Sequence, residues 1–353
     1  MAHAAGHSSL RSKLSGLPKV ELHRHLEGSL RLETLCEIAR DFKLDLPTDP
    51  DALRPLVQVH SADEATSSRF LSKFTVLRNF YQSPEVIRRL TYEVVEDAAR
   101  DHIRYFELRF TPMALAKTRG YALHEVTHWV LTAVEEARRA FPQMHVELIA
   151  SVNRHEPLAV AEKVAQIAAD HKEDIVGLDL AGDEANHSAT PFEALFQEAR
   201  RAGLGITAHA GEWSGSPTVR HAIEQLGAQR IGHGVRIMED PDVVALARER
   251  GTVFEVCVTS NVQSGVVRRL SDHALPRMLA DGLLATINTD DPAISDITLT
   301  DEYQIASESL GLTSEQLHTA ILTAASAAFL SPREKSQVVA DFQAALAGET
   351  PAA

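Results

Sequence analysis

The stretch Lys19–Leu26, KVELHRHL, is a short β-prone run that contains two histidines one residue apart. Seven further runs rich in valine, isoleucine and leucine follow it, with helical patterns between them. The eight predicted strands are Lys19–Leu26, Tyr105–Phe110, His145–Val152, Ile175–Leu180, Gly205–His209, Arg230–His233, Val253–Val258 and Leu283–Asn288. Strands that alternate with helices form a parallel sheet, and eight such repeats fit the roughly 250 residues of a closed barrel. We therefore predict an α/β fold, specifically a (β/α)8 TIM barrel.

Helix signals support this alternation. The long connection from Thr34 to Ala99 predicts extra helices after the first strand, and we expect them to cover the site. Capping residues mark four predicted helix starts, at Ser83-Pro84, Thr190-Pro191, Asp240-Pro241 and Thr313-Ser314. The sequences that begin at Thr190 and Thr313 also have the spacing of a capping box. A doubly wound open sheet is the competing architecture, but no GxGxxG fingerprint follows the first strand.

Composition limits the class of protein. The chain has 353 residues with 35 basic and 49 acidic side chains, so its formal net charge of −14 argues against a nucleic-acid partner. Its two cysteines, Cys36 and Cys257, form no disulfide framework, and we expect Cys257 to be a small buried hydrophobe. No apolar run reaches membrane-spanning length and no signal peptide is evident, so we expect a cytoplasmic protein.

We expect one domain over residues 17–347. The first sixteen residues, MAHAAGHSSLRSKLSG, are small and polar, and we interpret residues 1–16 as a flexible N-terminal tail. No internal repeat or low-complexity linker indicates a second domain.

Polar side chains follow most of the predicted strands at the point where each strand ends. In a parallel barrel the functional groups lie at the carboxyl ends of the strands, because the connecting loops converge there. The residues at these ends are His23, His25 and Glu27, Gly182 to Glu184, His209 to Glu212, His233, Ser260 and Asn261, and Asp290 and Asp291. This distribution predicts a chemical site at one rim of the barrel.

The two histidines of the first strand, His23 and His25, project to the same face because side chains alternate along a strand. In isolation such a pair is more often a hydrogen-bonded surface feature than a metal site. His209 and Asp290 stand at other strand ends and offer further ligands. Three imidazoles and a carboxylate suit zinc with an activated water, and iron or manganese also bind such donors.

Three other residues have both a chemical and a structural interpretation. Glu212 is a general acid if burial raises its pKa, or a carboxylate at a helix N-terminus. His233, between two glycines, is a base or electrostatic partner beside a metal-bound water, or a satisfied polar residue. Asp291 contacts substrate or caps the helix that begins at Pro292. The sequence offers no explanation for Glu255, which lies inside an apolar run.

Six motifs in this order make the chain resemble the adenosine deaminase family of the amidohydrolase superfamily: LPKVELHRHLEG, DLAGDE, HAGE, RIGHG, EVCVTSN and TINTDDP. The resemblance extends from about Leu17 to Tyr303. It implies a (β/α)8 barrel with one zinc ion, and by position it assigns as ligands His23, His25, His209 and Asp290.

The resemblance also implies a reaction and the residues that perform it. An activated water attacks C6 of a purine nucleoside, ammonia leaves and the 6-oxo purine remains. By position, Glu212 protonates the ring nitrogen N1, while His233 orients and activates the water together with the Asp290 ligand. The implied substrate-binding residues are His25, Glu27, Gly182 at N3 and Asp291 at N7. The PCxxC signature of the zinc deaminases that act on flipped bases is absent.

Departures from the family pattern bear on the substrate. Adenosine-specific members usually have HLDG, in which the aspartate reaches the ribose 5′-hydroxyl, whereas this chain has Glu27. The run Leu108–Pro112 is similar to the adenosine type and unlike the FDPQ run of adenine deaminases, and Val258 replaces the usual proline. We expect adenosine or a close relative. The alternatives are adenine and a 5′-modified adenosine such as aminodeoxyfutalosine.

Two other classes of function fit the sequence less well. A different metal-dependent hydrolase on the same barrel often needs a bridging lysine at the end of the fourth strand, and none occurs there. A non-catalytic nucleoside binder would tolerate loss of a ligand or of Glu212, yet all are present. The oligomeric state is not indicated by the sequence.

Overall fold

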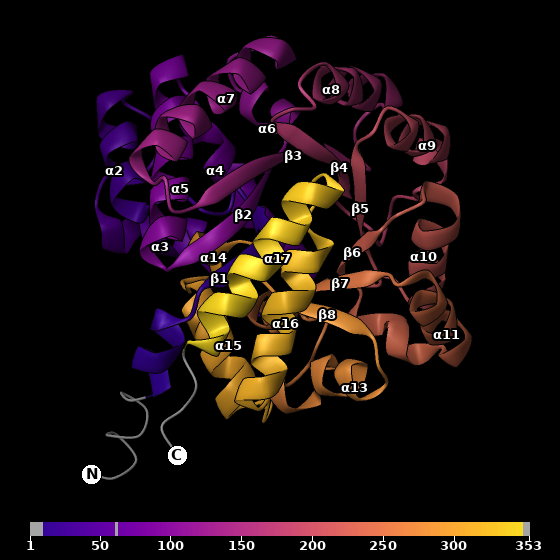
Figure 1. Ribbon diagram of the computed structural model, residues 1–353. Helices are drawn as coiled ribbons and strands as arrows, with labels where there is room; N and C mark the ends of the chain where they lie inside the picture. Colours follow the sequence, from indigo (N-terminus) through magenta and orange to yellow (C-terminus); the bar gives the residue numbers. More distant parts are fainter. Residues whose placement is uncertain (1–9, 61–62, 349–353) are drawn as a thin grey trace.

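The computed structural model describes residues 10–60 and 63–348, and its centre is a barrel of eight parallel strands (Figure 1). Each strand pairs with the next strand in the sequence. The strands are β1 (Lys19–His25), β2 (Ile103–Phe110), β3 (His145–Asn153), β4 (Ile175–Ala181), β5 (Gly205–Ala210), β6 (Arg230–His233), β7 (Val253–Val256) and β8 (Leu284–Ile287). The predicted (β/α)8 fold is confirmed.

Helices occupy the connections and surround the barrel (Figure 1). Between β1 and β2 lie α2 (Leu32–Asp41), α3 (Pro50–Val57), α4 (Ser67–Leu77), η1 (Arg78–Phe80) and α5 (Pro84–Arg100). The later connections contain α6 (Pro112–Ala116), α7 (Leu123–Ala140), α8 (Leu158–Asp170), η2 (Thr190–Phe192), α9 (Glu193–Arg201), α10 (Ser216–His221), η3 (Ala222–Leu226), η4 (Val235–Glu239), α11 (Pro241–Arg250), α12 (Val258–Gln263), η5 (Leu270–Asp272) and α13 (Leu275–Ala280). After β8 come α14 (Pro292–Ser295), α15 (Leu299–Glu308), α16 (Ser314–Ala327) and α17 (Pro332–Ala347).

The barrel closes between β1 and the residues that follow β8. The Leu22 N–H donates to Asn288 Oδ1 at 3.0 Å, so a side chain replaces one bond of the strand ladder. Beyond it, the His25 N–H donates to the Asp290 carbonyl at 2.8 Å, and the Asp290 N–H donates to the His23 carbonyl at 2.9 Å. Residues predicted to form the site therefore also close the barrel.

Three of the four predicted capping residues are confirmed. The side chains of Ser83, Asp240 and Thr313 each accept a backbone N–H from the first turn of α5, α11 and α16. The prediction at Thr190 is wrong, because this residue lies inside the 3₁₀ turn η2 and no side chain caps α9. The Ser188 hydroxyl accepts the Thr190 N–H at 3.1 Å and starts the turn earlier than the pattern suggested.

The seventh strand is shorter than predicted at its C-terminal end. We predicted Val253–Val258, but β7 ends at Val256 and α12 begins at Val258. The buried carboxylate of Glu302, on α15, accepts the N–H groups of Val258 and Thr259 at 2.9 Å each. This carboxylate caps α12 from a distant part of the sequence, which local patterning cannot reveal.

The N-terminal segment is more ordered than we expected. Residues 10–16, predicted as part of a flexible tail, are helical. Leu14 is buried in the core and Arg11 forms an ion pair with Asp301, so the segment is attached to the body of the barrel. The rest of the predicted tail, residues 1–9, lies outside the described residues. None of the described helices combines the length and apolar character needed to cross a bilayer.

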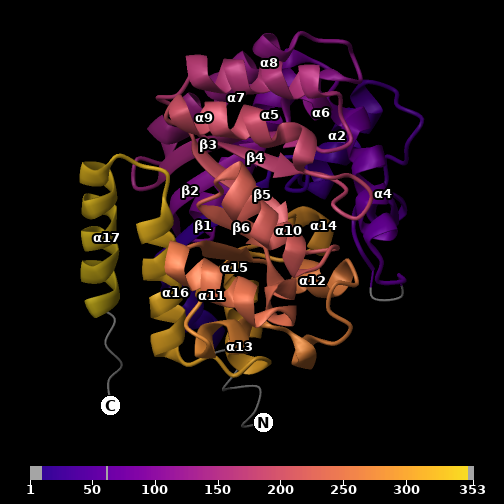
Figure 2. The same cartoon turned by 90° about the vertical axis from the view of Figure 1, so that its right-hand side faces the viewer.

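An aromatic plug closes the N-terminal end of the barrel. Helices α16 and α17 lie at this end, on the side away from α4 and α12 (Figure 2). Phe329, between the two helices, packs so closely on the strands that a Cβ at Gly205 would lie 2.2 Å from its ring. The Phe329 N–H donates to Glu107 Oε1 at 2.7 Å, and the Arg230 guanidinium lies 3.6 Å from the ring centroid.

The close packing of Phe329 predicts that any side chain at Gly205 destabilises the fold. Gly205→Ala should lower the free energy of unfolding by about 1–3 kcal/mol, because the added methyl group overpacks the contact with Phe329. Denaturant unfolding followed by circular dichroism would measure the change. Gly16→Ala is the matched control, since a Cβ added there would meet no described atom within 4 Å. Equal stability of the two variants would contradict the tight plug.

Candidate active site

A cavity of about 390 Å³ lies at the carboxyl ends of the strands. Its floor is formed by residues from the strand ends, including His25, His209 and His233. Its cover includes Phe70 and Phe74 of α4. The expectation that the helices inserted after the first strand cover the site is therefore confirmed.

The four predicted metal ligands converge on one point. Asp290 Oδ1 lies 3.3 Å from His23 Nε2 and 3.4 Å from His25 Nε2. His25 Nε2 lies 3.2 Å from His209 Nε2. All four side chains are buried or nearly so, which keeps the cluster away from bulk water. A fourth imidazole, His233, lies in the same cluster, with its Nε2 atom 3.9 Å from Asp290 Oδ2.

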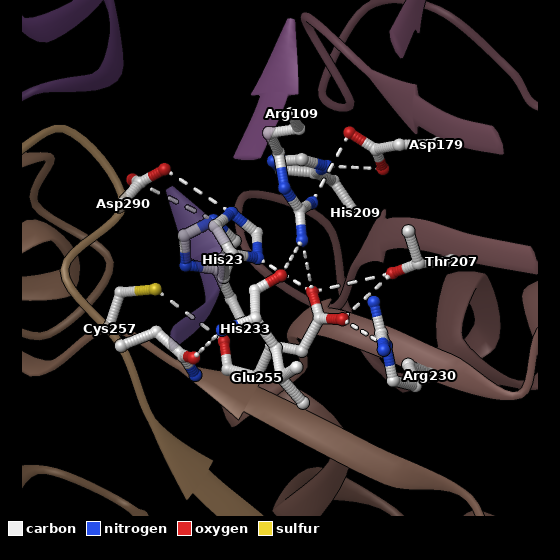
Figure 3. Close-up of polar contacts among 12 residues, drawn as sticks. His23, Arg109, Asp179, Thr207, His209, Arg230, His233, Glu255, Cys257 and Asp290 are labelled. Carbon is white, nitrogen blue, oxygen red and sulfur yellow. Dashed lines mark hydrogen bonds and ion pairs between the residues drawn. The ribbon is translucent and has the colours of Figure 1, made fainter. Parts of the chain in front are cut away.

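Carboxylates fix the tautomers of two of these histidines (Figure 3). His23 Nδ1 lies 2.8 Å from Glu255 Oε2, and His209 Nδ1 lies 3.1 Å from Asp179 Oδ1. A carboxylate accepts hydrogen bonds and cannot donate them, so each Nδ1 atom carries the proton. The Nε2 atom of each imidazole therefore presents a lone pair to the centre of the cluster, as a metal ligand must.

A separate chain of hydrogen bonds gives His233 the opposite tautomer. The Leu275 N–H donates to His273 Nδ1 at 3.1 Å, so His273 carries its proton on Nε2 and donates to Asn261 Oδ1 at 3.3 Å. The amide group of Asn261 then donates to His233 Nδ1 at 3.0 Å. His233 consequently presents an N–H and not a lone pair, which distinguishes it from the ligands beside it.

The donor set fits a divalent metal ion. His23 Nε2 is buried and, within the described ranges, has no hydrogen-bond partner. A buried acceptor without a donor costs about 1–3 kcal/mol, and a cation in the cluster removes that cost. Imidazole nitrogens and one carboxylate are ligands that zinc, iron and manganese accept. The structure therefore contains a cluster of histidine and aspartate side chains that could hold a metal ion.

Glu255, which the sequence left unexplained, holds the centre of the barrel (Figure 3). Its Oε2 atom accepts hydrogen bonds from His23 and, at 2.7 Å, from Arg109, and its Oε1 atom accepts one from Arg230 at 2.6 Å. Burial opposes ionisation, but the two guanidinium groups outweigh it and hold the pKa of Glu255 below its usual range. The carboxylate stays charged and fixes His23.

Glu212 lies beside the metal cluster without belonging to it. Its Oε2 atom is 3.7 Å from His233 Nε2, and the residue is buried. Burial, together with the negative charges of Asp290 and Glu184, raises its pKa well above the usual range. The alternative interpretation as a helix-end carboxylate is wrong, because α10 begins only at Ser216. Glu212 is therefore a buried carboxyl group in the cavity whose surroundings favour the protonated form.

Asp291 faces the cavity and does not cap the next helix. It occupies the N-cap position of α14, but its side chain accepts no N–H from that helix. Its Oδ1 atom is buried with no partner in the described part of the chain. A Cβ at Gly28 would lie 1.8 Å from this atom, so only glycine fits there. Burial and the charges of Asp290 and Glu27 raise the pKa of Asp291 well above its usual range.

Glu27 and Gly182 line other parts of the cavity. Glu27 Oε1 accepts the Thr111 N–H at 2.6 Å, while Oε2 finds no hydrogen-bond partner among the described residues. Burial raises the pKa of Glu27 to about 7. Gly182 has φ +89°, a conformation open to glycine, and a Cβ there would lie 3.0 Å from His155 Nδ1.

Two site residues have strained backbones. His233 has φ +59° and Asp290 has φ +65°, in the left-handed region that costs non-glycine residues about 1–3 kcal/mol. His233 is the last residue of β6 and Asp290 follows β8 by three residues, and each turns its side chain into the cluster. The surrounding hydrogen bonds, including the one from Ser260 Oγ to Asp290 Oδ2 at 2.7 Å, maintain these conformations.

Sequence reasoning missed the residues that orient the ligands. Asp179 and Glu255 begin the motifs DLAGDE and EVCVTSN, but the sequence analysis assigned roles only to residues nearer the strand ends, and Arg109 lies inside a predicted strand. A signal was nevertheless present, because strands buried on both faces are normally apolar. Charged residues of both signs inside several such strands indicate a paired polar network in the barrel interior.

Comparisons with known proteins agree with this geometry. Residues 18–345 match the sequence profile of a family described as adenosine deaminase. An adenosine deaminase from Klebsiella pneumoniae is 41% identical over 327 residues, which cover 92% of this chain and 97% of the relative. The structure of an adenine deaminase from Arthrobacter aurescens matches with a TM-score of 0.86 at 29% identity, covering 94% of this chain and 99% of that chain. An amidohydrolase from Burkholderia ambifaria with bound zinc shares the fold, with a TM-score of 0.86 at 24% identity, covering 96% and 94%.

The carboxylate behind His209 should control metal affinity. Asp179→Asn removes the charge that fixes the imidazole, so we expect metal affinity to fall about 10–100-fold. Competition with a chelator of known affinity would measure the change. Asp174→Asn is the control, because Asp174 pairs with Arg138 on the outside of the barrel. Unchanged affinity in the Asp179 variant would refute the assigned role.

Proposed function

The chain belongs to the adenosine deaminase family, and from that membership we propose that it hydrolyses adenosine to the 6-oxo purine and ammonia. One observation carries the proposal. The cavity places a cluster of imidazole and carboxylate side chains beside Glu212, a buried carboxyl group whose pKa is raised well above its usual range. Hydrolysis at a ring carbon requires an activated water and a proton for the ring, and these two features supply both.

We propose that zinc is the metal. The ligands would be His23, His25, His209 and Asp290, a set of three nitrogens and one oxygen of the kinds that zinc accepts. A bound zinc ion lowers the pKa of a coordinated water to about 7 and thereby supplies a nucleophile at neutral pH. Metal analysis of the purified protein would distinguish zinc from iron and manganese.

Glu212 is assigned as the acid that protonates the purine. A carboxyl group that is neutral at pH 7 can donate its proton to a basic ring nitrogen, and N1 is the nitrogen next to C6. Protonation draws electrons from C6 and makes that carbon more electrophilic. The raised pKa of Glu212 is thus the property that a general acid needs, and a carboxyl group with a purely structural role would not need it.

His233 and Asp290 are assigned to the orientation of the attacking water. The Nε2–H of His233 points into the space between Glu212 and Asp290, where it can donate a hydrogen bond to that water. Asp290 Oδ2 lies on the same side, while Oδ1 faces the ligand imidazoles. One donor and one acceptor together define the direction of attack.

Asp291 and Gly182 are assigned to the purine ring, next to His25 on the floor of the cavity. The surroundings of Asp291 favour its protonated form, and its Oδ1 atom has no partner among the described residues, so its carboxyl group can donate to N7. The Gly182 backbone can approach N3 closely because no side chain intervenes. Glu27 would contact the sugar through its free Oε2 atom, with Oε1 fixed by Thr111.

The acid role of Glu212 predicts the behaviour of an isosteric variant. Glu212→Gln should lower kcat by about 10²–10⁴-fold, because the amide cannot supply the proton. The metal content and affinity for the 6-oxo product should be retained. Turnover close to that of the unmodified protein would exclude this residue as the acid.

The role of Glu212 as an acid also predicts how kcat/KM changes with pH. The active form of Glu212 is protonated, and its pKa is raised, so kcat/KM should be maintained at neutral pH and fall as pH rises through that pKa. Steady-state kinetics across pH would show the alkaline decline in the unmodified protein, and the residual activity of the glutamine variant should lack it.

A substrate panel tests the overall function and the role of Glu27 together. Zinc-loaded protein should convert adenosine to inosine with release of ammonia, and should convert 5′-deoxyadenosine less well if the 5′-hydroxyl donates to Glu27. Glu27→Gln should reduce that preference, typically by less than about tenfold.

Failure to deaminate adenosine, 2′-deoxyadenosine, adenine or aminodeoxyfutalosine would overturn the proposed function. Faster conversion of adenine or of aminodeoxyfutalosine would reassign the substrate within the same chemistry.

A further inference from the structure

We propose that Glu184 is a positioning residue for this reaction, which fixes the loop that carries Glu212. The inference rests on the function proposed above and extends it to a residue that does not line the cavity. Glu184 follows β4 by three residues and is only 4% exposed. Its carboxylate points to the loop of residues 211–214, which joins β5 to α10.

The carboxylate accepts five hydrogen bonds from one neighbouring segment. Oε1 accepts the Gly211 N–H at 2.7 Å and the Thr218 hydroxyl at 2.6 Å. Oε2 accepts three successive backbone N–H groups, at 3.1 Å from Glu212, 2.8 Å from Trp213 and 3.0 Å from Ser214. All five partners are donors, and a carboxylate is a side chain that accepts hydrogen bonds without donating any.

The loop needs such an anion to hold its shape. Residues 211–214 belong to neither a strand nor a helix, so their N–H groups have no ladder to donate to. Gly211 has φ +63°, and this left-handed residue turns the following N–H groups toward one point. Converging N–H groups form a concave anion-binding site, called a nest, and here the anion comes from the protein itself.

Arg236 holds the carbonyl groups of the loop of residues 211–214, independently of Glu184. Arg236 Nη1 donates to the Trp213 carbonyl at 2.8 Å, and the Arg236 N–H donates to the Gly211 carbonyl at 3.0 Å. Glu184 and Arg236 therefore hold the N–H and carbonyl groups of the same loop. Between them, the Glu212 side chain reaches the cavity with Oε2 at 3.7 Å from His233 Nε2.

The negative charge of Glu184 supports the acid role of Glu212, as the hydrogen bonds to the loop do. The negative carboxylate lies close enough to Glu212 to disfavour a second negative charge, which supports the raised pKa of that acid. Arg154, which donates to the His209 carbonyl, moderates the effect with its positive charge. Glu184 thus both aims Glu212 and favours its protonated form, without touching substrate.

The kinetic test is the substitution Glu184→Gln. The amide nitrogen would face N–H donors and release part of the loop, and a displacement of about 1 Å at the acid typically lowers kcat about 10²-fold. Because substrate contacts are made by other residues, KM should change by less than about threefold. Glu184→Asp keeps the charge and should recover part of the lost kcat.

A double-mutant cycle tests whether Glu184 acts through Glu212. If it does, the double variant Glu184→Gln/Glu212→Gln should turn over no more slowly than Glu212→Gln alone. Additive losses would assign Glu184 an effect independent of the acid. Asp240→Asn, which alters a carboxylate that caps α11, is the control for the loss of a backbone-capping anion.

Tryptophan fluorescence tests the loop directly and without turnover. The chain has two tryptophans, and Trp213 lies in the loop itself. With Trp129→Phe as background, Glu184→Gln should increase quenching of Trp213 by acrylamide, while far-ultraviolet circular dichroism stays unchanged. Glu184→Asp should give intermediate quenching, so it serves as the second variant if the glutamine protein does not fold.

The results separate failure of the inference from failure of the proposed function. If the unmodified protein deaminates adenosine and Glu184→Gln does so equally well, or if Trp213 quenching is unchanged, the positioning role is wrong. If the unmodified protein is inactive toward every adenine substrate, the proposed function is wrong, and the quenching measurement still decides whether Glu184 holds the loop.

Discussion

The contact on which the rest of the barrel depends is the carboxylate of Glu255 between two guanidinium groups and an imidazole. Arg109 and Arg230 come from different strands, and each bonds a different oxygen of Glu255. Charges buried this deeply persist only when they neutralise one another, and loss of one partner typically costs about 3–5 kcal/mol. The same carboxylate sets the tautomer of His23. The interior that stabilises the barrel therefore also prepares its metal ligand.

This link between the stability of the barrel and the metal ligands extends along the whole barrel axis. A continuous chain of polar contacts leads from Phe329, at the N-terminal end of the barrel, to the metal cluster at the other end. It contains four carboxylates and two guanidinium groups, those of Glu107, Asp179, Glu255, Asp290, Arg109 and Arg230. Four negative and two positive groups leave an excess of 4 − 2 = 2 negative charges. A divalent cation among the ligands balances that excess. Within this chain of contacts, the balance of charge favours a metal ion as the ligand geometry does.

The sequence predicted the groups that reach the cavity far better than the groups that hold them. His23, His25, His209 and Asp290 could be found because each stands at a strand end, a position fixed by local pattern. Asp179, Glu184 and Glu255 belong to recognisable motifs, but they act through partners distant in sequence, so the motifs do not reveal which groups they contact. The errors at the end of β7 and at the start of α9 have the same origin. The end of β7 depends on a carboxylate from α15, and the start of α9 depends on a turn set by a preceding hydroxyl.

The fold also divides its acidic side chains into two groups by environment alone. Glu255 and Asp290 are buried against cationic or imidazole groups, which hold each pKa below its usual range despite burial. Glu212 and Asp291 are equally buried but face the cavity near other carboxylates, and each pKa is raised. Ionised carboxylates can hold a metal and orient imidazoles, whereas protonated ones can donate hydrogen bonds. The ring nitrogens N1, N3 and N7 of an adenine base are acceptors, so carboxyl groups whose environment favours the protonated form are the donors that the proposed reaction requires.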